Sequence, residues 1–421
     1  MMNSRILRVA SLCLAITLML MLLPWQPTLA VTDSKTAVLD HQYVSTRFDI
    51  DLEQEWTAES FAEALAAVSS GNEIEVAEPF SLADALQAAV TAANYLELAL
   101  SYTPDKTDAR LAAYDLESSS DTDIDRFIAA GLDAGLYDAE TAAAALASSL
   151  PPDAATVADL LYNVAEANGN TRHYLGYSDD AEIDARLNQL WDTFAIFEDE
   201  WLTEVGSKAV EDQIVTGFNL KHGAYDAHFD PALTLQYGHS SILHAHQLLV
   251  LLKSEDVRAK VALEPKISVY QYLIEWGEIG EPTPTYEVRE VAPDFYLAYA
   301  VEYDLLFEFD SKEDMAQFDG IVREYAKKWE GNEDAVGLIA DAWWQPLYTA
   351  LRDDMPSDEY YKIHDCIVRN GDYRLHTFVL DETITETLEA LQAIAPDAPI
   401  ETVERFCNEA FHNYLTGADF Q

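Results

Sequence analysis

Residues Phe295–Phe309 read FYLAYAVEYDLLFEF, and this run decides the fold class of the second half of the chain. Aromatic and aliphatic side chains fill it almost without interruption, which is typical of one or two β-strands. Arg258–Leu263 and Ile267–Leu273 precede it and have the same strand-like composition. Helical stretches are expected on either side, at Ser241–Ser254 and Lys312–Lys328. The second half is therefore predicted to combine helices and strands.

A β-hairpin is predicted nearer the end of the chain. Tyr361–Val368 and Tyr373–Leu380 both have strand character and flank Asn370-Gly371. This dipeptide favours a tight turn between antiparallel strands. Two helices are predicted after the hairpin, at Ile384–Ile394 and Ile400–Tyr414.

The first half of the chain is predicted to be helical. Ser81–Leu100 opens with a Ser-x-x-Asp cap and keeps apolar residues at spacings of three and four. Further helices are expected at Asp121–Ala134, Ala139–Ser149, Ala154–Ala167 and Asp180–Val210. The fold class is therefore predicted as α+β. An acidic helical domain at 31–215 would precede an α+β domain at 216–421 with a mainly antiparallel sheet.

The first thirty residues are typical of a secretory signal peptide. Arg5 and Arg8 precede the apolar run Val9–Leu23, and a small-residue cleavage site ends at Ala30. The alternative is an uncleaved membrane anchor, for which the apolar run is short. We expect the chain to be exported to a periplasm or the outside of the cell, with no membrane contact after cleavage.

The composition is strongly acidic. The chain has 421 residues, with 25 Lys and Arg against 75 Asp and Glu, which gives a formal net charge of −50. This excess argues against nucleic acid as a partner, because binding to phosphates needs clustered Lys and Arg. The acids are spread along the chain, which predicts adaptation to a saline environment where salt screens their repulsion. Capture of a cation or a basic substrate is the alternative.

Two cysteines follow the predicted signal peptide, Cys366 and Cys407. In an oxidising compartment they can pair and close a loop of about forty residues, with a stabilisation of about 4 kcal/mol in the chain-entropy model. The alternative is two buried free thiols. Neither cysteine belongs to a CxxC motif, so a redox or zinc-finger role has no support.

Five of the ten histidines fall in one short stretch of the second half. Neutral imidazoles near carboxylates suit a divalent transition metal, and Asp226 and Asp230 lie in the same stretch. The spacing matches no established metal motif, so a set of hydrogen-bonded or capping histidines is the alternative. The candidate metal ligands are His222, His228, His239 and His246.

A second candidate site is the turn before the predicted helix Ser241–Ser254. A serine at a helix N-terminus lies near backbone N–H groups that favour a developing oxyanion. Gly238-His239-Ser240 is similar to a nucleophile elbow, although Ile242 stands where that motif has a glycine. The alternative is a serine that only caps the helix. The candidate catalytic residues are Ser240, Ser241, His244 and His364.

Residues 241–263 resemble the core helix and following strand of transglutaminase-like proteins of the cysteine-protease fold. The segment LLKSEDVRAKV, Leu251–Val261, is similar to the part that leads from that helix into the sheet. In that family a cysteine opens the helix, where this chain has Ser241. The resemblance implies either a serine variant or a non-catalytic relative. The candidates for the family's His and Asp on later strands are His364, Asp365 and His376.

Three functions remain in view. Because no catalytic motif is complete, we predict a binding or scaffold module with a degenerate transglutaminase-like core. The first alternative is an exported hydrolase or acyl-transfer enzyme that uses Ser240 or Ser241 with a histidine. The second is a transition-metal protein that uses the cluster His222–His246. The sequence does not identify the ligand, which can be a small molecule, a peptide or a saccharide.

Overall fold

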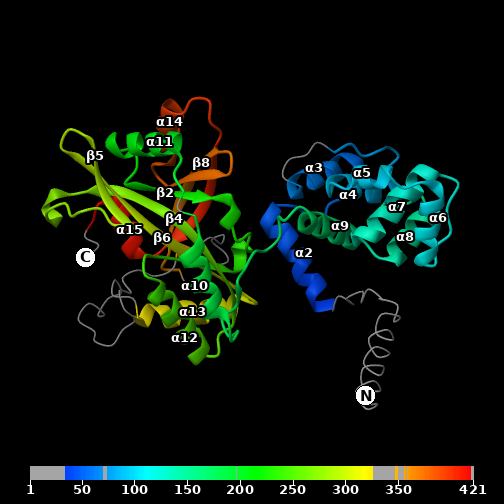
Figure 1. Ribbon diagram of the computed structural model, residues 1–421, viewed down its shortest axis with the longest axis horizontal. Coiled ribbons are helices and arrows are strands. Elements are labelled where there is room, and N and C mark those ends of the chain that lie inside the picture. Colours follow the sequence, from blue (N-terminus) through cyan, green and yellow to red (C-terminus); the bar gives the residue numbers. More distant parts are fainter. Residues whose placement is uncertain are drawn as a thin grey trace, which may run out of the picture. The chain divides into compact units, whose positions relative to one another are not determined.

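The computed structural model describes residues 34–69, 74–195, 197–325, 347–348, 355–356 and 358–418 (Figure 1). The predicted signal peptide, residues 1–30, lies outside these described residues. Helices make up the first part of the chain. They are α2 (Ser34–Phe48), α3 (Ala58–Val68), α4 (Leu82–Ala92), α5 (Leu96–Leu100), α6 (Pro104–Ala113), α7 (Thr122–Ala134), α8 (Ala139–Ala147) and α9 (Ala154–Ala167).

Side-chain caps fix where several of these helices begin. Ser81 and Asp84 form a reciprocal capping box at the start of α4, and Asp121 accepts the backbone N–H groups of Asp123 and Ile124 in α7. The predicted helix Ser81–Leu100 divides into α4 and α5. Apolar faces of these helices meet in one core, which includes Phe61, Leu65, Leu86, Phe127 and Leu161.

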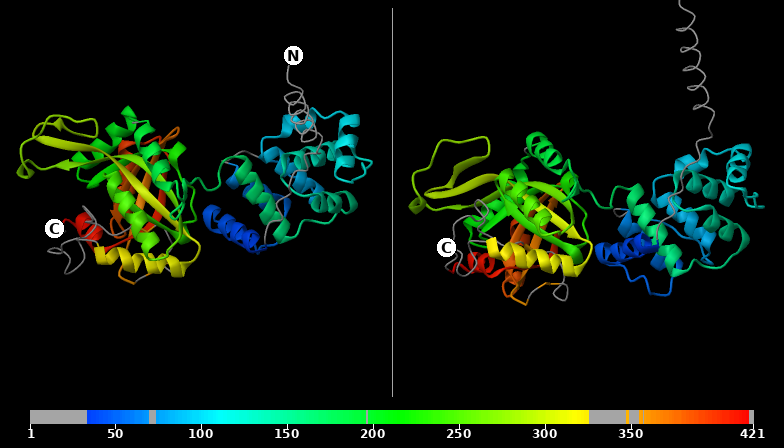
Figure 2. Two further views of the ribbon diagram at one scale, coloured as in Figure 1. Left: turned by 60° about the horizontal axis from the view of Figure 1, so that its bottom comes forward. Right: turned by 90° about the horizontal axis from the view of Figure 1, so that it is seen from below.

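The second part is built on one ten-stranded antiparallel sheet within the described residues. The strands are β1 (Gly176–Tyr177), β2 (Gly217–His222), β3 (Thr234–His239), β4 (Ala259–Tyr272), β5 (Tyr286–Ala292), β6 (Phe295–Phe309), β7 (Leu347–Tyr348), β8 (Tyr361–Asn370), β9 (Tyr373–Leu380) and β10 (Ile400–Cys407). The order is β4-β2-β9-β8-β10-β7-β3-β6, and β6 also pairs with β4. The sheet therefore curls around and closes on itself (Figure 2).

The predicted α+β class is confirmed, with helices preceding a mainly antiparallel sheet. The hairpin is also confirmed, because Asn370 pairs with Tyr373 across the turn and Gly371 has a positive φ of 59°. The run Phe295–Phe309 is one strand, β6. The two predicted strands at 258–263 and 267–273 are a single strand, β4.

The predicted helix Ile400–Tyr414 is wrong. Its first half is the strand β10, and only Glu409–Thr416 forms a helix, α15. Apolar residues at 400, 403, 406 and 407 have helical spacing. The strand forms nevertheless, because all eight residues of β10 pair with β8, and pairing with a neighbouring strand overrides local preference.

Further helices cover the outer face of the sheet. They are α10 (Ile183–Thr193), α11 (Glu200–Glu211), α12 (Ile242–Ser254), α13 (Lys312–Tyr325) and α14 (Ile384–Ile394). Phe307 on β6 packs on Phe318 of α13, with ring centroids 5.1 Å apart. Leu187 of α10 and Leu202 of α11 also belong to the apolar clusters around the sheet. The predicted boundary between the two domains, at residue 215, therefore lies after α10 and α11, although both helices pack in the apolar clusters around the sheet.

Alternation along the strands places polar side chains on the inner face. Successive side chains of a strand point to opposite faces, so Leu305 and Phe307 of β6 face the helices while Asp304 faces inward. Cys366 and Cys407 are both buried and free, so the described residues contain two free thiols, the second of the two predicted alternatives. None of the described helices combines the length and the apolar character that crossing a membrane requires.

Candidate functional site

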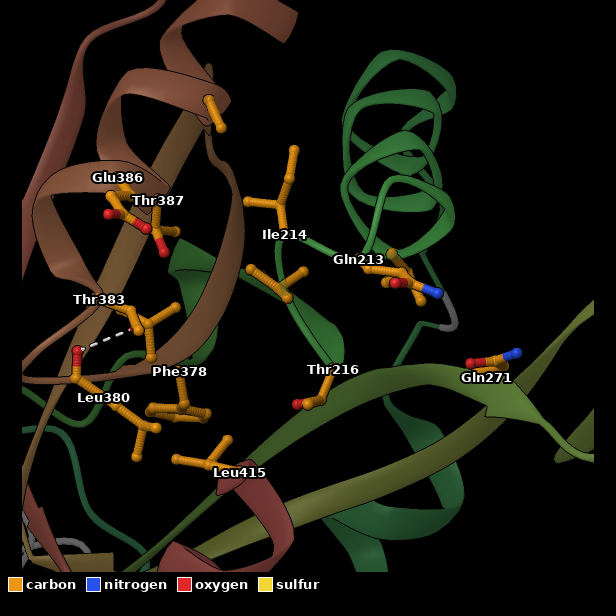
Figure 3. A pocket seen from close by; sticks show the side chains of 14 residues that line it. Gln213, Ile214, Thr216, Gln271, Phe378, Leu380, Thr383, Glu386, Thr387 and Leu415 are labelled. Atoms are coloured by element: carbon orange, nitrogen blue, oxygen red, sulfur yellow. Dashed lines mark hydrogen bonds between the residues drawn. The ribbon is translucent and has the colours of Figure 1, made fainter. Parts of the chain in front are cut away.

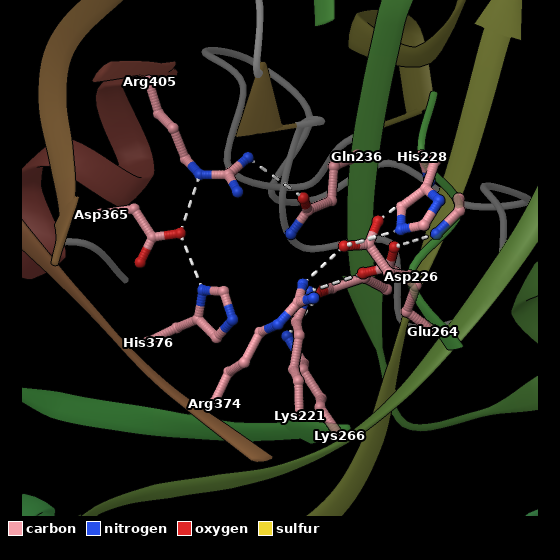
Figure 4. A network of polar contacts seen from close by, with 12 residues as sticks. Lys221, Asp226, His228, Gln236, Glu264, Lys266, Asp365, Arg374, His376 and Arg405 are labelled. Carbon is pink, nitrogen blue, oxygen red and sulfur yellow. Dashed lines mark hydrogen bonds and ion pairs between the residues drawn. The ribbon is translucent and has the colours of Figure 1, made fainter. Parts of the chain in front are cut away.

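Charged and polar side chains converge on the inner face of the closed sheet (Figure 4). We call this set the central cluster. Seven strands contribute to it, namely β2, β3, β4, β6, β8, β9 and β10. Its members are Lys221, Gln236, Glu264, Lys266, Asp304, Asp365, Arg374, His376 and Arg405.

One half of the central cluster is a set of buried ion pairs. Asp304 is 1% exposed, forms an ion pair with Lys221 at 2.5 Å and accepts a hydrogen bond from Lys266 at 2.8 Å. Lys221 also donates to Glu264 at 2.9 Å. Burial alone would raise the pKa of Asp304, but the two ammonium groups outweigh it and hold that pKa well below its usual range. Gly238 on β3 leaves room for this pair, since a Cβ there would lie 3.1 Å from both Asp304 Oδ1 and Lys266 Nζ.

The other half centres on the fully buried Asp365. Its Oδ2 accepts from His376 Nδ1 at 2.9 Å and from Arg405 Nε at 3.0 Å. Burial opposes ionisation, but His376 and Arg405 outweigh it, so the pKa of Asp365 lies below its usual value. Because the ionised carboxylate only accepts hydrogen bonds, His376 carries its proton on Nδ1. In the neutral form of the ring, the lone pair is then on Nε2.

Two polar atoms of this half have unmet hydrogen-bonding capacity. Within the part of the chain that the structure describes, His376 Nε2 and Asp365 Oδ1 are buried and have no hydrogen-bond partner. His376 is 6% exposed. Asp365 Oδ1 is an acceptor, and so is His376 Nε2 when the ring is neutral. A buried polar group without a partner is costly, so these two atoms require a hydrogen-bond donor from a bound molecule or water.

A third group adjoins the central cluster from the segment after β2. Asp226 accepts from Arg374 Nη1 at 2.5 Å, and His228 Nε2 lies 3.5 Å from the same carboxylate. Burial lowers the pKa of His228 below the ordinary value for histidine. Ala227 and Phe229 of this segment pack on the inner face of the sheet, in a small apolar cluster with Ala262 and Leu306.

The candidate metal ligands do not form a common site in the described structure. His222 Nδ1 accepts from the Ala224 backbone, and His239 Nδ1 accepts from Ser241. His246 contacts Asp184 at 2.6 Å and Asn188 at 3.0 Å. Among the residues described, no group of three or more His, Cys, Asp or Glu side chains is arranged to hold a metal ion. These histidines instead make local hydrogen bonds, as in the alternative to a metal site that the sequence left open.

The serine candidates lie at the start of α12, and the Ser241 side chain makes no capping hydrogen bond there. Ser240 is exposed, and Ser241 occupies the N-cap position of α12. The Ser241 carbonyl accepts from Tyr303 at 2.8 Å. Because His239 Nδ1 accepts the Ser241 backbone N–H, the neutral His239 ring carries its proton on Nε2 and offers no lone pair there to a serine.

Of the two histidine candidates of the serine hypothesis, His244 lies one helical turn from Ser241, and its backbone N–H donates to the Ser241 carbonyl at 3.0 Å. His244 is buried and stacks on His239, with ring centroids 4.1 Å apart. His364 Nε2 contacts Asp381 at 2.6 Å, and alternation along β8 places it on the face opposite Asp365. The structure thus pairs Asp365 with His376 and not with its neighbour in sequence.

A cleft of about 540 Å³ opens beside the end of β9 (Figure 3). We call it the end cleft. Of the fourteen residues that line it, Glu386 alone carries a charge. Its walls come from α11 and the segment between α11 and β2, the end of β4, the end of β9, α14 and α15. The lining residues are Val210, Gln213, Ile214, Val215, Thr216, Gln271, Phe378, Val379, Leu380, Thr383, Glu386, Thr387, Ala390 and Leu415.

Comparison with known proteins adds no assignment. No protein-family model matches the chain, and no curated protein or solved structure matches it. The resemblance of residues 241–263 to transglutaminase-like proteins therefore stays a prediction. The structure has a helix, α12, followed by a strand, β4, over these residues.

Most of the central cluster was not among the residues singled out from the sequence. Lys221, Lys266, Asp304 and Arg405 are missing from the predicted sites, and His376 and Asp365 enter only through the family resemblance. A signal does exist, because Lys266 and Asp304 interrupt the apolar runs VALEPKISV and VEYDLLFEF. A charged residue inside a strand that is otherwise apolar indicates a buried partner.

Proposed function

We propose that this protein is a binding module for a small molecule with a hydroxyl group, which donates a hydrogen bond at His376 and Asp365. One observation carries the proposal. His376 Nε2 and Asp365 Oδ1 are buried polar atoms without hydrogen-bond partners in the described structure, beside side chains that are paired. A hydroxyl group donates to Asp365 Oδ1, and it can donate to His376 Nε2 of the neutral ring. A closed sheet with a few convergent polar groups inside is a common arrangement for small-molecule sites.

The charges around this pair favour a neutral donor. Lys221 and Arg405 both interact electrostatically with Asp365. A metal ion or an ammonium group placed at Asp365 Oδ1 would meet their positive charges at close range. A hydroxyl group donates a hydrogen bond without adding charge, which makes an alcohol or a sugar hydroxyl the best match.

A binding role also fits the serine geometry. The backbone of Ser241 contacts His239 and Tyr303, and the Nδ1 of His239 that accepts its N–H is not available as a base for the serine. The degenerate transglutaminase-like core and export after cleavage near Ala30 remain part of this proposal. The mass of the mature protein isolated from its own cells would test the cleavage site.

Two substitutions of His376 test the proposed site. His376→Asn keeps an amide nitrogen near the position of Nδ1 for Asp365 but removes Nε2, whereas His376→Gln places an amide near the position of Nε2. His364→Gln, on the opposite face of β8, is the matched control. With glycerol, glucose and 1-butanol as probes, we expect the Nε2 resonance of isotope-labelled His376 to shift in the wild type. We expect binding to weaken about fivefold in His376→Asn, the usual effect of one hydrogen bond.

Either of two results would contradict the proposal. One is an Nε2 resonance that none of the probes moves. The other is equal affinity in the wild type and in folded His376→Asn. Circular dichroism and thermal unfolding of each variant would show that a loss of binding does not come from a loss of fold.

A further inference from the structure

We propose that the end cleft holds the apolar body of the same ligand, so that the ligand is a neutral amphiphile, an alcohol with an apolar tail. This inference rests on the proposed function, since it places the hydroxyl at His376 and the tail in the end cleft. It adds the chemical class of the molecule and a second set of contacts.

Strand β9 connects the two places. His376 and Phe378 are two residues apart on this strand, so their side chains lie on the same face of the sheet. Phe378 lines the end cleft, pairs in register with Asp365 of β8, and has its ring centroid 6.0 Å from Cζ of Arg405. Phe378 therefore lines the end cleft and lies beside Arg405, which itself contacts Asp365.

The lining of the end cleft selects against charged molecules. In a chain with 75 acidic residues, a lining of fourteen residues with Glu386 as its one charge is unusually neutral. A carboxylate ligand would be repelled by Glu386 and by the acidic surface. The lining offers apolar contact from Ile214, Phe378 and Leu415, with hydroxyl and amide groups such as Thr216 between them.

The size of the end cleft suits a small ligand. Its volume of about 540 Å³ lies inside the range of roughly 300–1,000 Å³ that is usual for small-molecule sites. Because apolar surface is removed from water along the tail, affinity should depend on tail length. Each added methylene should tighten the Kd by roughly fourfold until the end cleft is filled.

Straight-chain molecules with one head group test this inference on the full-length protein. The probes are 1-butanol, 1-hexanol and 1-octanol, and octanoate serves as the charged counterpart of 1-octanol. Titration calorimetry gives the Kd, in high salt so that the acidic surface is screened. We expect affinity to rise along the alcohol series, and octanoate to bind at least roughly tenfold more weakly than 1-octanol.

A pair of tryptophan substitutions on α14 separates the end cleft from the rest of the protein. Ala390 lines the end cleft, whereas Ala393 on the same helix is exposed. Ala390→Trp fills part of the end cleft and should weaken 1-octanol binding by roughly fifteenfold, about the effect of two lost methylene contacts. Ala393→Trp adds the same side chain to the same helix and should leave the Kd unchanged.

The variants also separate this inference from the proposed function. If Ala390→Trp binds 1-octanol as the wild type does while His376→Asn binds it more weakly, the end cleft is not the tail site and the proposed function stands. If only Ala390→Trp weakens binding, the end cleft binds the tail but the proposed role of His376 is wrong. Absence of a chain-length dependence, or equal binding of octanoate, would overturn the inference.

Discussion

Asp304→Asn should be among the most destabilising changes in the sheet, although it alters one atom. Asp304 is 1% exposed and is shared by Lys221 and Lys266. With asparagine there, Lys221 keeps Glu264 at 2.9 Å, but Lys266 loses the carboxylate that it contacts at 2.8 Å. Removing one member of a buried pair leaves an uncompensated charge, which costs about 3–5 kcal/mol. We expect the free energy of unfolding to fall by that amount.

A second substitution shows whether the unpaired ammonium group of Lys266 causes the loss of stability. Lys266→Met removes that charge and keeps a side chain of similar length. In Asp304→Asn/Lys266→Met nothing is left uncompensated at position 266, so the double variant should be more stable than Asp304→Asn alone. Urea unfolding, followed by tryptophan fluorescence at constant salt, gives the four free energies of this cycle. The reasoning fails if Asp304→Asn costs less than about 1 kcal/mol, or if the second substitution destabilises the protein further.

Three further outcomes follow from the same structure. The pKa of Asp304 is lowered in the folded protein, so its stabilisation is present above the unfolded-state pKa and is lost as the pH falls through the folded-state value. The difference in unfolding free energy between wild type and Asp304→Asn should therefore shrink below about pH 4. A difference that stays constant in acid unfolding would contradict this. Burial raises the pKa of Cys366 to about 12 and that of Cys407 above its usual range, so both thiols are protonated near pH 8. Iodoacetamide should therefore modify both cysteines only after the protein unfolds, and peptide mass spectrometry measures this modification. Gly238→Ala should lower the free energy of unfolding by about 1–3 kcal/mol, because the added Cβ crowds the Asp304–Lys266 pair. Gly280→Ala is the control, since the space around its Cβ position is open, and it should unfold in urea like the wild type.

Local signals explain which parts of the fold could be predicted. Asn370-Gly371 marks a hairpin through its own backbone preferences, and Ser81 with Asp84 marks a helix start through side-chain caps. The strand at Ile400–Cys407 has no such signal, because its apolar spacing is helical and its partner β8 lies thirty residues earlier. The closure of the sheet is likewise non-local, since it depends on the pairing of β4 with β6 and on the neighbours of β7.

The candidate site was harder to predict than the fold. Searches along a sequence favour residues that are close together, such as the five histidines between His222 and His246. The central cluster instead takes about one residue from each of seven strands, and Asp365 contacts His376 across a hairpin and Arg405 on the next strand. The family resemblance left His364 and His376 as equal candidates. Only the closed sheet shows which face of each strand points inward, and it places His376 beside Asp365 while His364 lies on the opposite face.

The distribution of charge links the acidic composition to the proposed ligand. Four of the twenty-five Lys and Arg residues, Lys221, Lys266, Arg374 and Arg405, lie in the central cluster, and each contacts a carboxylate there. The inside of the sheet is therefore close to electrically balanced, while most of the remaining acids face solvent. Salt screens exposed charges strongly and buried pairs weakly, so a saline medium relieves the surface without loosening the central cluster. An anion approaching this protein meets net repulsion and a cation is attracted to many surface carboxylates. A neutral alcohol responds mainly to the end cleft, whose lining has one charge, and to the two buried polar atoms of His376 and Asp365.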